Sequence, residues 1–142
     1  MEIRRLTIVD YKEIIRLWSR AGLPSKPGGR DSRQEIAAQM DANPDFFLGA
    51  FEGRHLVGTA IVSSDMRKGW INRLAVDPDC RRRGVAKALI EESEKTLRGH
   101  GIRIFCGLIE ASGKASKALF RKCGYTEHRD ISYFSKRDGD AI

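Results

Sequence analysis

One stretch, Leu74 to Leu89, constrains this chain more than any other part of it. It reads as an apolar strand, then the polar turn Asp77-Pro78-Asp79-Cys80, and then a helix that begins at or near Gly84. The first turn of a helix leaves about four backbone N–H groups without partners and carries about half a positive charge. Arginines at positions 81–83 add charge, and a glycine lets the backbone approach a ligand closely. The turn therefore suits a diphosphate, although a basic loop leading into a surface helix is an equal alternative on these residues alone.

The charge of the whole chain also favours an anionic partner. The net charge is +7, of which residues 1–80 carry +1 and residues 81–142 carry +6. Such a concentrated field suits nucleic acid, an acidic lipid surface or a phosphorylated small molecule. Aromatic residues do not interleave with the basic clusters, and no nucleic-acid recognition motif is present. A basic nucleic-acid-binding module is therefore the weaker reading.

Composition excludes several other classes of protein. Hydrophobic residues make up 41% and charged residues 32% of the 142, as in a globular chain that needs no staple. No segment approaches the roughly 20 apolar residues of a membrane span, and no apolar stretch follows the N-terminal charges as in a signal peptide. Cys80, Cys106 and Cys123 are too widely spaced for a disulfide framework or zinc site, and no metal is expected. We expect a cytoplasmic protein.

The apolar periodicity predicts an α/β chain of mixed architecture. The expected order is β-α-α-β-β-β-α-β-α, followed by a strand region from Tyr125 with which Ile131–Phe134 pairs. This gives a mostly antiparallel twisted sheet of six to seven strands flanked by four helices. One parallel pair is expected, between Trp70–Val76 and Ile102–Ile109, because a helix connects them. We expect a single domain over residues 1–137 and a short polar tail over residues 138–142.

Two motifs in this order resemble the GNAT superfamily of N-acetyltransferases. The string LAVDPDCRRRGVAKALI resembles motif A, Gln/Arg-x-x-Gly-x-Gly/Ala, which is here Arg81-x-x-Gly84-x-Ala86. The string ASGKASKALFRKCGY resembles motif B, which runs from Asn-x-x-Ala-x-x-Leu-Tyr to a closing Gly-Phe. The likeness spans about residues 1–137 and is closest to the small stand-alone YpeA-like group.

The resemblance implies a GNAT fold with acetyl-CoA bound where the two parallel strands splay apart. The backbone of Leu74 and Val76 would hold the pantetheine arm, with Ala75 between them also at the cofactor site, and the Val76 N–H would polarise the acetyl carbonyl. The amides of Arg82, Arg83, Gly84, Val85, Ala86 and Lys87 would hold the pyrophosphate, and Arg81 at the start of motif A would also contact the cofactor.

Three positions of motif B depart from the family pattern. Gly113 replaces an Asn that normally bonds the pantetheine, and Ser116 replaces a small Ala. Phe120 replaces a Tyr that protonates the leaving thiolate in many members, and a phenyl ring cannot supply that proton. The general base is not identified. The unplaced candidates Glu52, Asp65 and Glu110 are each expected to be ordinary surface carboxylates, and a base acting through ordered water is an alternative.

These features predict an acetyl-CoA-dependent N-acetyltransferase whose acceptor, a primary amine of a small molecule or protein, attacks the thioester directly. A GNAT-fold CoA sensor without robust turnover is the alternative, because Phe120 has no ionisable proton to donate and no general base is evident. The loop Gly22–Arg30 and the helix that follows it form a candidate substrate lid, and Arg30 is placed to meet an acidic acceptor. Trp18 either lines the acceptor pocket or, with greater weight, packs in the core. The resemblance also suggests a homodimer.

Overall fold

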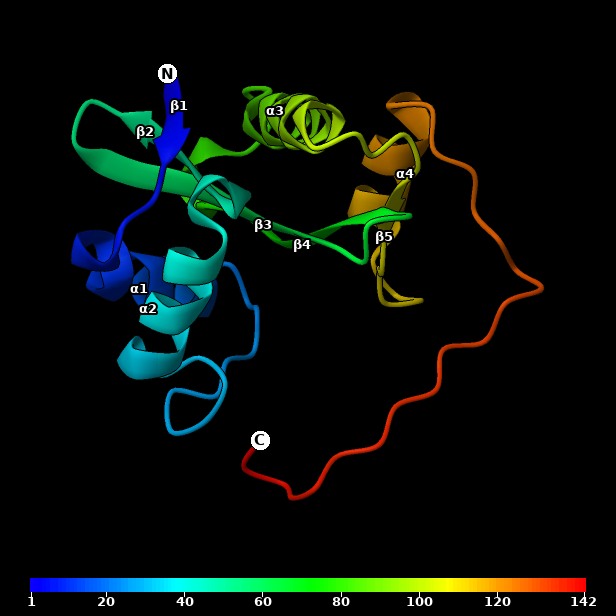
Figure 1. The fold of residues 1–142 in the computed structure, drawn as a ribbon. Helices are drawn as coiled ribbons and strands as arrows, with labels where there is room; N and C mark the ends of the chain where they lie inside the picture. The colour runs from blue at the N-terminus through cyan, green and yellow to red at the C-terminus, as the bar shows by residue number, and fades with distance from the viewer.

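In the computed structural model, which describes residues 1–142, one five-stranded sheet carries helices on both faces (Figure 1). The strands follow each other across the sheet in chain order: β1 (Glu2–Arg5), β2 (Phe47–Glu52), β3 (His55–Ser64), β4 (Gly69–Val76) and β5 (Phe105–Gly107). The first four strands pair antiparallel, and β4 pairs with β5 in parallel. The mixed sheet with one parallel pair is as predicted.

Four α-helices flank the sheet, also as predicted. They are α1 (Tyr11–Arg20), α2 (Arg33–Ala42), α3 (Val85–Gly99) and α4 (Lys114–Lys122), with short 3-10 turns η1 (Ile8–Asp10), η2 (Pro44–Phe46) and η3 (Pro78–Cys80). Figure 1 shows α1 and α2 below the sheet, α3 above it and α4 beside β5. The Ser32 side chain caps α2 by accepting the Glu35 N–H at 3.1 Å.

Glycines allow α3 to lie close against the sheet. A Cβ on Gly58 of β3 would come within 2.8 Å of Val85 Cγ1, and one on Gly69 of β4 within 2.5 Å of Leu97 Cδ1. Leu89 and Leu97 of α3 are fully buried in this contact. The close packing fixes the N-terminus of α3 relative to the end of β4, which is the strand-to-helix turn singled out above.

The predicted sixth and seventh strands do not form. Neither Tyr125 nor Ile131–Phe134 belongs to a strand, and the side chains of Ile131, Tyr133 and Phe134 are 71%, 72% and 89% exposed. Alternating apolar residues become a strand only where a partner edge is available. Here the neighbouring edge strand, β5, has only three residues, so the count of six to seven strands is corrected to five.

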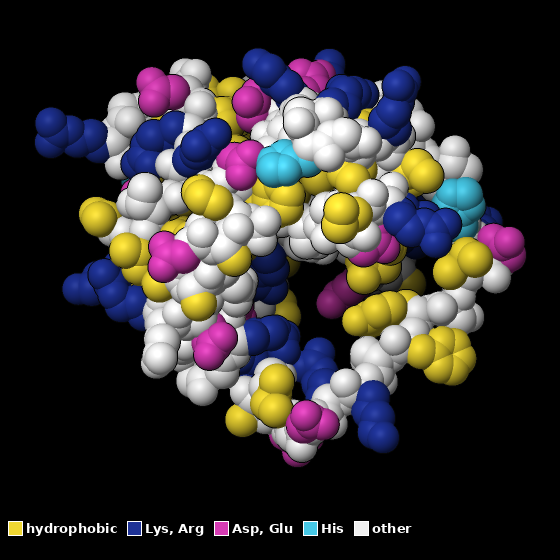
Figure 2. All heavy atoms as spheres, viewed as in Figure 1, with side chains coloured by type: hydrophobic (Ala, Val, Ile, Leu, Met, Phe, Trp, Pro, Cys, Tyr) yellow, Lys and Arg dark blue, Asp and Glu magenta, His cyan; other side chains and the backbone are white.

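Residues 126–142 instead form an irregular tail that returns to the loop before α2. Figure 2 shows an opening between this tail and the body of the protein. At its end, Asp140 and Ile142 accept hydrogen bonds from Lys26 Nζ at 3.2 Å and Arg30 Nη1 at 2.7 Å. None of the helices combines the length and the apolar character needed to cross a membrane.

Candidate active site

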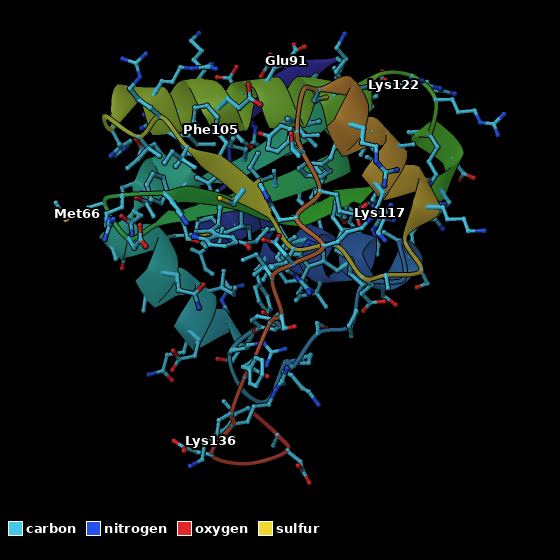
Figure 3. The ribbon with its side chains drawn as sticks, turned by 90° about the vertical axis from the view of Figure 1, so that its right-hand side faces the viewer. Met66, Glu91, Phe105, Lys117, Lys122 and Lys136 are labelled. Carbon is cyan, nitrogen blue, oxygen red and sulfur yellow. The ribbon has the colours of Figure 1, made fainter.

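The strands β4 and β5 splay apart at the centre of the candidate site. They pair only from Gly69 to Ile71, opposite residues 105–107, whereas β4 continues to Val76. The predicted strand Ile102–Ile109 is shorter at both ends, because only residues 105–107 pair with β4. Figure 3 shows this edge, with Phe105 on β5, Lys117 and Lys122 on α4, and Glu91 on α3.

The backbone of β4 beyond the splay has a free edge. The Asp77 N–H donates to Val57 O of β3 at 2.8 Å, so it points away from β5. Because successive N–H groups of a strand point to opposite edges, the N–H groups of Val76 and Leu74 point to the side where β5 has ended. Ala75 pairs with Thr59 of β3 and is buried. The strand predicted to hold the pantetheine therefore has unpaired backbone donors on the side that faces the splay.

A carboxylate clamp holds the turn that follows β4. The side chain of Asp77 is buried, accepts the Asp79 N–H at 2.9 Å and pairs with Arg20 of α1 at 3.0 Å. The Arg20 guanidinium, followed by the Asp79 N–H, lowers the pKa of Asp77 from 3.8 to about 2. The clamp ties α1 to the start of the turn and keeps Asp77 ionised.

Beyond the clamp, seven consecutive backbone N–H groups lack a protein acceptor. None of residues 81–87 donates a backbone hydrogen bond, and the first such bond of α3 is Ala88 N–H to Gly84 O at 3.0 Å. Arg82 and Gly84 have φ values of +65° and +79°. Left-handed residues alternating with ordinary ones turn successive N–H groups toward a common concavity that suits anions. Gly84 thus supplies the positive φ, and no other atom would lie within 4 Å of a Cβ at this position.

The motif B residues lie on and before α4. Gly113 is the residue before the first turn of α4, Ser116 is exposed, and Phe120 is buried against Tyr125 and beside Gly107 of β5. The Tyr125 hydroxyl donates to Glu94 of α3 at 2.6 Å. Burial, and then this carboxylate, raise the pKa of Tyr125, so neither ring is a ready proton donor at the splay.

The face of the sheet that carries α2 contains a cavity near the point where the splay begins. Its volume is about 440 Å³, and it lies between α2, β3 and β4, with Arg30, Asp31 and Arg73 in its lining. A second cavity, of about 370 Å³, lies at β1 and the far part of α3 and is remote from the splay. The first cavity is therefore the candidate acceptor pocket.

Comparison with known proteins decides the family. The model of the acetyltransferase (GNAT) family matches residues 11–125. The chain belongs to the GNAT acetyltransferase family. It is 33% identical over 138 residues to an acetyltransferase of Photorhabdus laumondii, covering 96% of this chain and 95% of that protein. An acetyltransferase of Sodalis glossinidius is 31% identical over 137 residues, with the same coverage.

Solved GNAT structures share the fold. A putative acetyltransferase of Agrobacterium tumefaciens superposes with a TM-score of 0.77 at 18% identity, covering 97% of this chain and all of that one. The PaiA N-acetyltransferase of Thermoplasma acidophilum, solved in complex with coenzyme A, has a TM-score of 0.71 at 22% identity. That comparison covers 86% of this chain and 87% of the other.

Among the side chains weighed from the sequence, this GNAT protein uses Trp18 in its core. Trp18 is fully buried, and its indole N–H donates to Thr59 Oγ1 at 3.0 Å. Asp65 accepts the N–H groups of Arg67 and Lys68 in its own turn, and Glu52 and Glu110 are exposed. None of these three carboxylates lies in the acceptor cavity.

The sequence pattern did not indicate two residues that line the cavity, Arg73 and Asp31. Arg73 has a φ of +51° and lies in an irregular stretch of the β3–β4 pairing. Its carbonyl accepts the Thr59 hydroxyl at 2.9 Å. One sequence signal was available for it: Arg73 is the only ionisable residue in Trp70–Val76.

Proposed function

We propose that this protein transfers the acetyl group of acetyl-CoA to a primary amine by direct attack on the thioester. As a GNAT acetyltransferase it uses acetyl-CoA as the cosubstrate. The observation that carries the proposal is the run of unpartnered N–H groups at residues 81–87, at the end of a splayed strand. An anionic carrier with a thin arm fits both features, because its phosphates accept these N–H groups while its arm enters the splay.

The diphosphate of CoA binds the N–H groups of residues 81–87 in this proposal. Arg81, Arg82 and Arg83 add charge beside it, and the three side chains are exposed and free of ion pairs within the protein. Each hydrogen bond between an N–H group and a charged phosphate contributes about 1.5–3 kcal/mol. The pantetheine arm then runs along the free edge of β4 past Val76 and Leu74, with Gly113 and Ser116 on its other side.

The acetyl carbonyl accepts the Val76 N–H in the proposed reaction. The amine nitrogen attacks the carbonyl carbon, and the negative charge that develops on oxygen is stabilised by this N–H. The N–C bond forms, the C–S bond breaks, and CoA leaves as a thiolate. Phe120 supplies no proton, so water protonates the thiolate, and water also takes the extra proton from the attacking nitrogen, which leaves a neutral amide. A thiol of pKa about 8.5 is a fair leaving group without an acid.

A thermal-shift titration with acetyl-CoA tests the donor site. A ligand at 100 times its Kd stabilises the native state by about 2.7 kcal/mol. For a chain of this size that stabilisation raises the Tm by roughly 5–10 °C. Gly84→Glu places a side chain and a negative charge in the N–H cradle and is expected to abolish the shift.

Gly101→Glu is the matched control. Gly101 also has a positive φ, +83°, and open space around it, but it follows the opposite end of α3. Both substitutions therefore carry the same backbone strain, while only Gly84→Glu meets the proposed phosphate. An unchanged shift in Gly84→Glu, or no shift in the wild type, contradicts the proposal.

A CoA sensor without turnover is the second candidate, because the buried Phe120 has no ionisable proton to give to the leaving thiolate. Release of CoA thiol in the presence of amines, polyamines and peptides separates the two. Turnover with any acceptor supports the enzyme, whereas binding without turnover across the panel supports the sensor.

A further inference from the structure

Arg73 lies in the candidate acceptor cavity and has no hydrogen-bond or ion-pair partner in the protein. Its guanidinium makes no hydrogen bond or ion pair, and its Nε and Nη2 atoms are buried without an acceptor. Burial lowers the pKa of this guanidinium. Buried charges in proteins are normally paired, because removing a charge from water costs free energy that only a partner offsets. Since Nη1 is neither buried nor bonded, it is the nitrogen that a ligand reaches.

The protein nevertheless holds this guanidinium in place. Its Cζ lies 4.1 Å from the centre of the Trp18 ring, which is itself fixed by the bond to Thr59. The backbone of Arg73 has a positive φ and is anchored by the Thr59 hydroxyl. A strained backbone and an unpaired charge both cost folding free energy, and such costs are typically retained at binding sites. The fold thus holds the Arg73 guanidinium in a fixed position at the cavity instead of leaving it mobile in solvent.

The charges around Arg73 determine the net charge of the ligand that it can bind. Asp31 is buried, but one of its carboxylate oxygens already accepts the Lys26 N–H at 2.8 Å, and it makes no ion pair with Arg73. Arg30 also lines the cavity, but its Nη1 donates to Ile142 O at 2.7 Å, so Arg73 is the one of the two guanidiniums that has no hydrogen bond. The three charged side chains, Arg30, Asp31 and Arg73, leave a net charge of +1. An acceptor with a neutral amine and one carboxylate carries the opposite charge, whereas a phosphate monoester of about −1.5 to −2 at pH 7 exceeds it.

We propose that Arg73 binds a carboxylate of the acceptor, so that the amine acetylated by this protein belongs to a carboxylate-bearing molecule such as an amino acid. This inference rests on the proposed function. Arg73 lies three residues before Val76 on β4, roughly 10 Å along the strand. A carboxylate held at Nη1 would therefore anchor an acceptor beside the splay where the acetyl group is presented.

The test compares each standard α-amino acid with its α-amide as acceptor. The pair differs only in replacing the carboxylate by a neutral carboxamide. A nearby carboxylate raises the pKa of the amine, so the amide has more reactive free amine at pH 8 and the comparison is biased against our expectation. We expect kcat/KM at least 10-fold higher for the best acid than for its amide. Arg73→Gln should reduce that preference by about 10- to 100-fold, the loss expected for hydrogen bonds to a charged group.

Arg54→Gln, in the exposed turn between β2 and β3, is the matched control and should leave the preference unchanged. The acetyl-CoA thermal shift, measured on every variant, reports on the donor site separately. An intact shift with equal use of acids and amides, or with no acid used, overturns the carboxylate inference alone. Loss of the shift in the wild type overturns the proposed function, and this inference with it. The wild-type ratio needs no variant, so a misfolded Arg73→Gln does not prevent a decision.

Discussion

The Asp77 clamp offers a stability prediction whose size follows from the structure. The pKa of Asp77 falls from 3.8 to about 2, chiefly through its hydrogen bonds to Arg20 at 3.0 and 3.3 Å. At 1.36 kcal/mol per pKa unit, this corresponds to about 2 kcal/mol of folding free energy. The Arg20 side chain is 40% exposed, and screening by solvent reduces the value to about 1–2 kcal/mol.

Asp77→Asn removes the charge while keeping the shape and one acceptor oxygen. Urea unfolding at pH 7 should show a loss of about 1–2 kcal/mol relative to the wild type. Because the folded-state pKa lies below the unfolded value, the stabilisation is complete above pH 3.8 and is lost as the pH falls toward 2. The difference between the two proteins should therefore be constant from about pH 5 to 7 and shrink between about pH 4 and 2.

Asp79→Asn is the control for this experiment. The carboxylate of Asp79 also lies 3.1 Å from Arg20, but its side chain is 86% exposed, so we expect a change below about 0.5 kcal/mol. A difference for Asp77→Asn that is near zero at pH 7, or that does not narrow in acid, would refute the clamp.

Two further substitutions probe the frame of the site. Thr59→Val leaves the Trp18 N–H and the Arg73 carbonyl without their buried partner, and chemical denaturation should show a loss of about 2–4 kcal/mol, with Thr59→Ser nearer to wild type. Gly58→Ala forces a Cβ to within 2.8 Å of Val85, and the same assay should show a loss of about 1–3 kcal/mol. A neutral result for either variant contradicts the packing of this frame.

The strand-to-helix turn that leads into α3 could be predicted from the sequence because its signals are local. An apolar strand, a proline-containing turn, a glycine and a helical repeat follow one another within Leu74–Leu89, and each acts on its own neighbours. The structure confirms that α3 begins after Gly84. The Asp77–Arg20 clamp was not predictable in this way, since it joins residues 57 positions apart.

The absence of the C-terminal strands and the importance of Arg73 could not be predicted from the sequence, and the physical reason is the same for both. Alternation in Ile131–Phe134 signals a strand, but pairing depends on a partner edge that only the tertiary structure provides. Arg73 became significant because the local change of register and the Trp18 stack bury its charge, and neither is visible in a local pattern. Local signals thus indicated the turn that we propose as the donor site, whereas the proposed acceptor side depends on contacts between distant segments.

Amide NMR on the labelled protein titrated with CoA tests the central claim most directly, because it observes the proposed donors themselves. If the N–H groups of residues 81–87 bind the diphosphate, their proton resonances should move downfield together on saturation, with Gly84 among the largest shifts. Pantetheine, which lacks the diphosphate, should leave these resonances in place while perturbing Val76. Saturation by CoA with the resonances of residues 81–87 unmoved would contradict the account.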